Sequence, residues 1–300
     1  MIKKFLLIIP AFCLLTCLPG ETFSEEFRLN PGQKFFPPEV VERLAEALPE
    51  NKSVLIDLKA LMTAYPGFCL GVELGKGREL YLIMKNGAKI IYDDGQIKDF
   101  EKKLATPDLK DSLDQLYHPG VEKEPFQPDY DPGRFRVNAF FNAVYGGSAK
   151  EVRSNLVLVS FCGAKVMFNK QNGAAKALEN VGRELETLLS KRPQLRQYVF
   201  PLGGTYNWRW IAGTDRLSPH SWGIAIDLNP RYGAYWQGKN TEGGESILKM
   251  RDKYPVEIVE LFEKNGFIWG GKWSHFDLMH FEYRPELLEK WQLTKENAVK

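Results

Sequence analysis

The sequence predicts an α+β protein in which short antiparallel hairpins alternate with amphipathic helices. Two kinds of pattern support this class: apolar stretches that flank a glycine-containing turn, and apolar residues that recur at intervals of three and four. A third observation divides the chain, because residues 118–133 are dense in proline and glycine and therefore break regular structure. We expect a smaller α+β region at residues 25–130 and a second domain at residues 131–300.

The first 24 residues have the pattern of a secretory signal peptide. Lys3 and Lys4 precede an apolar stretch at residues 5–18, which is shorter than the roughly 20 residues that a bilayer span needs. Cleavage near Ser24 would export the mature chain to the periplasm or cell envelope, with no membrane span left. Two alternatives stay open: an uncleaved anchor, or a lipid on Cys17, where the sequence loosely resembles a lipobox.

The composition excludes two classes of protein. Lysine and arginine number 40 and aspartate and glutamate 38, a net charge of +2, which argues against the clustered positive charge of a nucleic-acid binder. Hydrophobic residues make up 44% of the chain, enough apolar surface to exclude a disordered protein. Cys69 and Cys162 could pair in an oxidising compartment. We prefer to interpret each as a buried apolar side chain.

Residues 25–130 contain signals for one helix and one hairpin. The helix begins at Pro37 and Pro38 and ends at Pro49, and its apolar stripe comprises Val40, Val41, Leu44 and Leu48. The hairpin pairs residues 80–84 with residues 88–92 around a turn at Lys85, Asn86 and Gly87. Neither element carries residues typical of a catalytic site.

The second domain has a more regular pattern. Helices are predicted over residues 137–144, over residues 174–191, and from Pro255 to just before Gly266. A hairpin is predicted between residues 155–161 and 165–168, with its turn at Cys162 and Gly163. We interpret these elements as the core, together with the aromatic residues Trp269, Trp273 and Phe281.

The first candidate functional site lies in residues 216–229, around His220 and Asp227. Alternation over residues 224–228 predicts a strand that places Asp227 on the face opposite the isoleucines. His220 precedes this strand on a loop, where Gly223 permits a close approach of the backbone. The loop histidine and the strand carboxylate can therefore converge on one point.

The second candidate site lies in residues 273–283, where Asp277 and His280 are three positions apart. Side chains at that separation on an extended strand face opposite ways. We therefore expect Asp277 in the turn that enters a strand at about Leu278. Its carboxylate would then stand beside a metal ion without binding it.

Together the two sites predict a zinc centre. One imidazole from each site and one carboxylate make three ligands, which leaves the fourth position open for water, and the remaining carboxylate is free to act as a general base. Each residue alone also has a structural interpretation, as a hydrogen-bonded core histidine or a turn aspartate. We interpret His118, in the proline-rich stretch, as structural. The presence of both patterns in one chain favours the metal site.

At this point the sequence resembles a known family. The strings SPHSWGIAIDLNP and WGGKWSHFDLMHFEY resemble the zinc D-alanyl-D-alanine carboxypeptidases of VanY type and the related L-alanyl-D-glutamate endopeptidases of bacteria and phages. The family pattern SxHxxGxAxD, followed by an acidic residue separated from a histidine by two residues, is matched at Ser218, His220, Gly223, Ala225, Asp227, Asp277 and His280. The resemblance is strong over residues 200–285 and extends back to Asp131. It does not cover residues 25–130.

The resemblance implies that zinc is held by His220, Asp227 and His280, with Asp277 as the general base where some relatives have glutamate. It also implies a hedgehog/DD-peptidase-like fold, with a small antiparallel sheet that carries the site and helices packed against it. His275 is the main competitor as a ligand, although the family pattern gives that position no metal role.

The family also places an arginine near the substrate, upstream of the first motif. Arg209 and Arg216 both qualify, and we favour Arg209 because Arg216 is close enough to His220 to brace its loop. Arg209 would either help to stabilise the developing oxyanion or hold a carboxylate of the substrate. We expect Ser218 to fix the loop or the tautomer of a histidine.

Resemblance and export together imply a substrate, the peptide stem of peptidoglycan. Removal of a terminal D-alanine is the first hypothesis for the reaction, and cleavage between L-alanine and D-glutamate is the second. Two rivals remain: a non-catalytic zinc module, as in the hedgehog signalling domains, and a wall-binding or partner-binding role for residues 25–130 with the peptidase as accessory.

Overall fold

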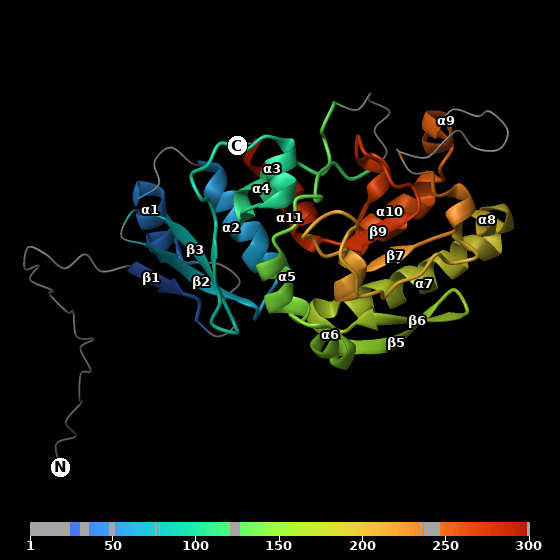
Figure 1. The fold of residues 1–300 in the computed structure, drawn as a ribbon, viewed down its shortest axis with the longest axis horizontal. Helices are drawn as coiled ribbons and strands as arrows, with labels where there is room; N and C mark the ends of the chain where they lie inside the picture. The colour runs from blue at the N-terminus through green and yellow to red at the C-terminus, as the bar shows by residue number, and fades with distance from the viewer. Residues whose placement is uncertain are drawn as a thin grey trace, which may run out of the picture.

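The computed structural model describes residues 25–30, 36–47, 52–75, 77, 79–120, 127–234, 236 and 247–298. The predicted signal peptide, the lipidation alternative at Cys17 and the predicted helix end at Leu48 and Pro49 lie outside these residues. The described chain is α+β, as expected, and it is elongated, with one sheet towards one end and the strands of the candidate site in the other half (Figure 1). Within the described ranges, no helix combines the length and the apolar character that crossing a bilayer requires.

The N-terminal part is a four-stranded antiparallel sheet with helices packed against it. The strands follow the order β1-β2-β3-β4 and comprise β1 (Glu25–Arg28), β2 (Cys69–Leu74), β3 (Leu80–Met84) and β4 (Lys89–Ile91). The helices comprise α1 (Pro38–Ala47), α2 (Lys52–Ala64), α3 (Phe100–Ala105) and α4 (Leu109–Asp114). The predicted hairpin is β3–β4, and Gly87 in its turn has a φ of +85°, a left-handed conformation that suits glycine.

The middle of the chain forms a hairpin covered by the longest helix. The elements are α5 (Asn138–Tyr145), α6 (Ala149–Asn155), β5 (Leu156–Phe161), β6 (Ala164–Asn169), α7 (Ala174–Lys191) and α8 (Arg196–Val199). Cys162 and Gly163 connect β5 to β6 with φ values of 48° and 83°, as a two-residue turn with both residues left-handed requires. The predictions for α5, α7 and this hairpin are confirmed.

The three-stranded sheet that carries the candidate site has the order β7-β9-β8, with both pairs antiparallel. Its strands and the helices around it are β7 (Ala225–Asp227), β8 (Phe267–Trp269), β9 (His280–Tyr283), α9 (Ile247–Asp252), α10 (Val256–Lys264) and α11 (Pro285–Ala298). Pro255 is the residue before α10 and its carbonyl accepts the first helical hydrogen bonds, so the helix begins one residue later than predicted. The strand predicted to start at about Leu278 starts at His280.

The two parts of the chain share one hydrophobic core. Helix α11, at the C-terminal end, packs against α2 near the centre of the molecule (Figure 1). The buried apolar residues form one contiguous cluster that runs from Phe27 to Leu287. Asp131, in the stretch predicted as a boundary, is 0% exposed. The predicted domain boundary between residues 130 and 131 therefore lies in a buried part of the structure, and the division into two domains stays a prediction.

Both described cysteines are free and buried, in agreement with their interpretation as apolar side chains. Burial raises the pKa of the Cys162 thiol to about 12 and that of Cys69 further. Neither thiol is therefore ionised at neutral pH, and neither is suited to act as a nucleophile.

Candidate metal centre

Asp227 and His280 face each other across the central strand pair of the sheet. The register of β7 and β9 places them directly opposite, and the Asp227 Oδ1 atom lies 2.9 Å from His280 Nδ1. Ile226 is fully buried in the core behind them, because successive side chains of a strand point to opposite faces. The predicted strand and its orientation are therefore present.

His220 reaches the same point from a short 3-10 helix, η3 (Pro219–Trp222), that leads into β7. Its Nε2 atom lies 3.2 Å from Asp227 Oδ2. The backbone turns after the helix at Gly223, which has a φ of +66°, and a Cβ there would lie 2.6 Å from a Leu156 methyl. The loop histidine and the strand carboxylate converge as predicted, and Gly223 is required for the turn.

The backbone of residues 203–205 fixes the orientation of the His220 ring. Gly204 pairs with Asp227 along the free edge of β7, and a Cβ on Gly203 would approach the Asp227 Cβ to 2.9 Å. This close pairing brings the Thr205 carbonyl to His220 Nδ1, which donates a hydrogen bond to it. Nε2 is therefore the ring nitrogen that faces Asp227 and that is left to bind a metal. Fixing the loop or the tautomer of a histidine is the role predicted for Ser218, whereas the tautomer of His220 is set by the Thr205 carbonyl.

The three side chains fit a zinc ion. Their ligand atoms all lie within 4.8 Å of one another. The two closest pairs are 2.9 Å and 3.2 Å apart, a spacing that suits neighbouring ligands of one ion with bonds of about 2.0–2.2 Å. Two neutral imidazoles and a carboxylate are a common donor set for catalytic zinc. The predicted ligands His220, Asp227 and His280 are thus brought together.

Without a metal, the charges of the site compensate one another. Burial would raise the pKa of Asp227, but hydrogen bonds from His220 and His280 hold it below its usual range. Burial would lower the pKa of His280, but its hydrogen bonds to Asp227 and Glu282 raise it to about 10. A metal ion must displace the proton between Asp227 and His280, so metal binding here releases a proton.

Glu282 is a residue of the site that the sequence analysis missed. It lies two positions after His280, on the same face of β9, and its Oε2 atom is 3.1 Å from His280 Nε2. A second ring nitrogen that donates to a carboxylate is the usual support of a metal-bound histidine. The only local signal was this i, i+2 spacing on a strand.

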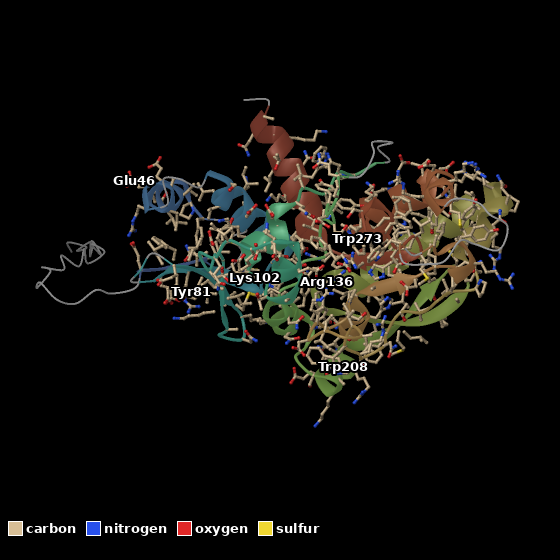
Figure 2. All side chains as sticks on the ribbon, turned by 45° about the horizontal axis from the view of Figure 1, so that its top comes forward. Glu46, Tyr81, Lys102, Arg136, Trp208 and Trp273 are labelled. Carbon is tan, nitrogen blue, oxygen red and sulfur yellow. The ribbon has the colours of Figure 1, made fainter. Side chains whose placement is uncertain are left out.

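Arg136 holds Glu282 in place. Its guanidinium nitrogens Nε and Nη2 donate to both carboxylate oxygens, and Glu282 is 0% exposed. Burial would raise the pKa of Glu282, but Arg136 and His280 hold it well below its usual range. Figure 2 shows Arg136 near the centre of the molecule, close to the Trp273 ring that its guanidinium covers at 5.8 Å.

Asp277 lies in the turn before β9, as predicted. Its carbonyl accepts a hydrogen bond from the backbone N–H of His280 at 3.2 Å. Its Oδ1 atom is buried and has no hydrogen-bond partner among the described residues, although buried carboxylate oxygens are normally paired. Burial raises the pKa of Asp277 to about 6, and the charges of His280, Asp227 and His220 also affect it. An unpartnered oxygen of this kind is available to a water or a ligand.

The two candidate arginines lie on the strand-like ribbon that precedes η3. Trp210 and Leu217 form a bridge in this ribbon. The Arg209 backbone is fixed on both sides by the Ser221 hydroxyl, which receives a hydrogen bond from its N–H and donates one to its carbonyl, and its side chain is exposed. Arg216 is half-buried. Ser218 is buried, and its N–H donates to the Arg209 carbonyl.

His275 lies apart from the three ligands. Its Nδ1 atom is 2.8 Å from the buried carboxylate of Asp131, and its ring stacks on Phe100 with centroids 5.0 Å apart. The carboxylate of Asp131 also accepts hydrogen bonds from Ser274 and Arg134. His275 is therefore held by Asp131, and among the described residues it belongs to no cluster of potential metal ligands.

The other predictions for this region concern the core. Trp269, Trp273 and Phe281 are buried, as predicted. His118 packs against Trp291 with ring centroids 4.4 Å apart, and its carbonyl accepts a hydrogen bond from Lys272. These contacts agree with a structural role.

A second group of acidic residues occurs in the N-terminal part, at Asp93, Asp94 and Asp108. The ammonium group of Lys98, itself 8% exposed, already lies 2.7 Å from Asp94 and 3.1 Å from Asp108. A third carboxylate, Asp111, is 2.7 Å from the same nitrogen. A lysine therefore already lies among these carboxylates, and Asp93 pairs with a second lysine, Lys110.

Comparisons with known proteins agree with the motifs. Residues 212–283 match the model of a peptidase family described as D-alanyl-D-alanine carboxypeptidase. The match covers less than a third of the chain, includes all three ligands together with Asp277 and Glu282, and supports the family that the two motifs resemble. Arg209 and residues 25–130 lie outside it. No curated protein and no solved structure matches the chain.

Proposed function

We propose that the chain is a zinc peptidase that removes the terminal D-alanine from the stem peptides of peptidoglycan. One observation carries the proposal: two histidines and a carboxylate converge with their ligand atoms within 4.8 Å, beside a carboxylate whose Oδ1 atom is buried and has no partner within the described part of the chain. His220, Asp227 and His280 are suited to hold a metal. The neighbouring carboxylate, Asp277, is suited to move a proton. The family match over residues 212–283 supports the same chemistry.

His220 would bind the metal through Nε2, Asp227 through its carboxylate, and His280 through Nδ1, because these atoms face one another. The Thr205 carbonyl and the Glu282 carboxylate accept hydrogen bonds from the opposite ring nitrogens. These contacts select the required tautomers before any metal arrives. Zinc bound here would supply a Lewis acid that activates water at neutral pH.

Asp277 would act as the proton carrier. Its Oδ1 atom accepts a proton from the attacking water and then returns it to the nitrogen of the leaving amine. A pKa raised by burial to about 6 suits both steps, because a general base works best when its pKa lies near the operating pH. Arg209, exposed beside the loop of His220, would bind the carboxylate of the substrate.

The substrate class rests on the family match and on the export predicted from residues 1–24. Removal of a single D-alanine is preferred because it is the reaction in the description of the matched family. Cleavage between L-alanine and D-glutamate is the second candidate, since pocket shape decides between the two bonds. A site of action in the periplasm or cell envelope follows from the same prediction of export.

The test is mass spectrometry of pentapeptide muropeptides incubated with the mature chain, with and without a chelator that zinc reverses. We expect the loss of one alanine, abolished by the chelator and restored by zinc. Cleavage after the first alanine would replace the carboxypeptidase with the endopeptidase. Stoichiometric zinc without any cleavage would overturn the enzymatic proposal in favour of a binding module.

A further inference from the structure

Glu282 is the first link in a buried chain of polar contacts that begins at the metal ligand His280 and ends in the N-terminal region. The Glu282 Oε1 atom accepts a hydrogen bond from Arg284 Nη1 at 3.0 Å. Arg284 Nε donates to Glu286 Oε1 at 2.5 Å, and the Tyr65 hydroxyl donates to Glu286 Oε2 at 2.6 Å. Tyr65 directly follows α2, 221 positions before Glu286. The chain of contacts therefore joins the metal centre to a region that the family match does not cover.

Every residue in this series of polar contacts is excluded from solvent. Tyr65, Glu282 and Arg284 are 0% exposed and Glu286 is 2% exposed. Ser112, in α4, adds a second contact from the N-terminal region, since its Oγ atom lies 3.4 Å from Arg284 Nη2. Hydrogen bonds between charged groups are strong in such an environment, and the loss of one partner is correspondingly costly.

We infer that the N-terminal region supports the metal centre from outside the peptidase motifs, and that Tyr65 is a positioning residue for His280. It acts through Glu286, Arg284 and Glu282. The inference rests on the proposed function in one respect, the identity of the metal ligands. It gives residues 25–130 a role that sequence patterns left open.

The physical reason lies in Arg284, which is shared between two carboxylates. Without the Tyr65 hydroxyl, Glu286 Oε2 loses the donor that it has here, and the guanidinium of Arg284 is drawn towards it. Glu282 then loses part of the contact that orients it. The ring of His280, whose Nε2 donates to Glu282, is held less firmly for the metal.

Tyr92, which lies outside this series of contacts, provides a matched control. Its hydroxyl also donates to a buried carboxylate of α2, Asp57 Oδ2, at 2.7 Å, and that carboxylate pairs with Lys290 of α11 at 2.7 Å. Both tyrosines are buried, and each donates to a carboxylate where α2 meets α11. The described contacts of Asp57 and Lys290 do not lead to His280. Tyr92→Phe therefore removes an equivalent hydroxyl without touching the metal support.

The experiment compares zinc affinity in the full mature chain for the wild type, Tyr65→Phe and Tyr92→Phe, by competition with a chromophoric chelator well below the unfolding temperature. Outer-shell partners of a metal ligand typically contribute about 10–100-fold to affinity. Because Tyr65 is three contacts further out, we expect Tyr65→Phe to weaken zinc binding about threefold to tenfold. Tyr92→Phe should bind zinc as the wild type does. Thermal unfolding of both variants shows whether they are destabilised to a similar extent.

A double-mutant cycle locates the coupling. In the Glu282→Gln background, Tyr65→Phe should cause no further loss of zinc affinity, because the route to His280 is already broken. Equal zinc affinity for Tyr65→Phe and Tyr92→Phe would overturn the inference, whether both match the wild type or both are weakened. A wild-type chain that binds no zinc would instead overturn the proposed function, so the two failures are distinguishable.

Discussion

Asp227 and His280 are directly opposed on neighbouring antiparallel strands, and the atoms Oδ1 and Nδ1 lie 2.9 Å apart. The pairing register of β7 and β9 therefore sets the distance between two of the three proposed ligands. The third, His220, joins them from η3, and its ring is oriented by the Thr205 carbonyl, in a segment that pairs with the other edge of β7 through Gly204. A short sheet thus fixes all three positions.

The ligand assignment predicts different outcomes for two nearby histidines. His220→Ala should lose most of the bound zinc and all turnover, because it removes one of three ligands. His275→Ala should keep a full complement of zinc, because Asp131 holds His275 away from the site. Metal content after dialysis against a weak chelator measures both. A full zinc content in His220→Ala would exclude it as a ligand.

Asp277→Asn should separate metal binding from catalysis. The amide has the same shape but cannot accept and return a proton, so we expect zinc to be retained and kcat to fall by about 10²–10⁴-fold. Asp277→Glu, which keeps a carboxylate at this position, is the matched variant and should recover part of the rate. Steady-state kinetics on a pentapeptide, with zinc measured in the same samples, is the test. Turnover near the wild-type level in Asp277→Asn would assign the proton transfer elsewhere.

The same substitution should stabilise the metal-free protein at neutral pH. Burial raises the pKa of Asp277 from 3.8 to about 6, so the folded state binds this proton more tightly than the unfolded state does. The folded state is therefore penalised as pH rises through this interval, by about 1–3 kcal/mol above pH 6. The amide side chain of the variant carries no charge and escapes the penalty.

Urea unfolding in the presence of a chelator measures this effect. At pH 7.5 the free energy of unfolding of Asp277→Asn should exceed that of the wild type by about 1–3 kcal/mol. At pH 4.5 the difference should shrink by at least about half. Most of the penalty accumulates between this pH and the folded-state pKa of about 6. A difference that is the same at both pH values would show that ionisation of Asp277 is not its cause.

The elements that the sequence predicts well are those whose signals are local. Helix α7 shows an apolar stripe, and the turns at Gly87 and Gly163 need a left-handed backbone that glycine adopts readily. Strand β1 has only four residues, Glu25–Arg28, too few for a recognisable alternation. It is stabilised by pairing with β2, more than 40 residues away, so tertiary contacts decide its conformation.

The same reasoning applies to the site. His220, Asp227, Asp277 and His280 could be identified because each lies in a short motif. Glu282 also lies within a motif, but its role depends on Arg136, 146 positions earlier in the chain. An ion pair across that separation leaves no pattern in a single sequence, because many folds could bring either residue to other partners. Charge pairing of this kind becomes visible only when the sheet and the segment around Arg136 are placed together.

Arg209 and Arg216 predict separable kinetic effects. Arg209→Ala should lower kcat/KM for a substrate with a free terminal carboxylate by about 10–100-fold, the value of a hydrogen bond between charged groups. Arg216→Ala should change it less than about threefold, since a bracing residue on a loop makes no contact with substrate. Zinc affinity should be unchanged in both variants. The reverse order of effects would transfer the substrate contact to Arg216.

Glu282→Gln should weaken zinc binding even though Glu282 is not a ligand. The amide can still accept a hydrogen bond from His280 Nε2, but it no longer carries the charge that makes the imidazole a stronger ligand. It also leaves Arg136 and Arg284 facing a neutral partner in a buried site. We expect zinc affinity to fall about 10–100-fold and the free energy of unfolding to fall by about 3–5 kcal/mol.

Arg136→Lys is the informative companion to Glu282→Gln, because it keeps the charge that faces Glu282 and removes the two-pronged contact. If the charge of Glu282 is what matters to His280, zinc affinity in Arg136→Lys should lie between that of the wild type and that of Glu282→Gln. Chelator competition at constant pH gives the order, with circular dichroism to confirm that each variant is folded. Wild-type affinity in a folded Glu282→Gln would show that the Thr205 contact to His220 and the register of β7 and β9 are sufficient to build the site.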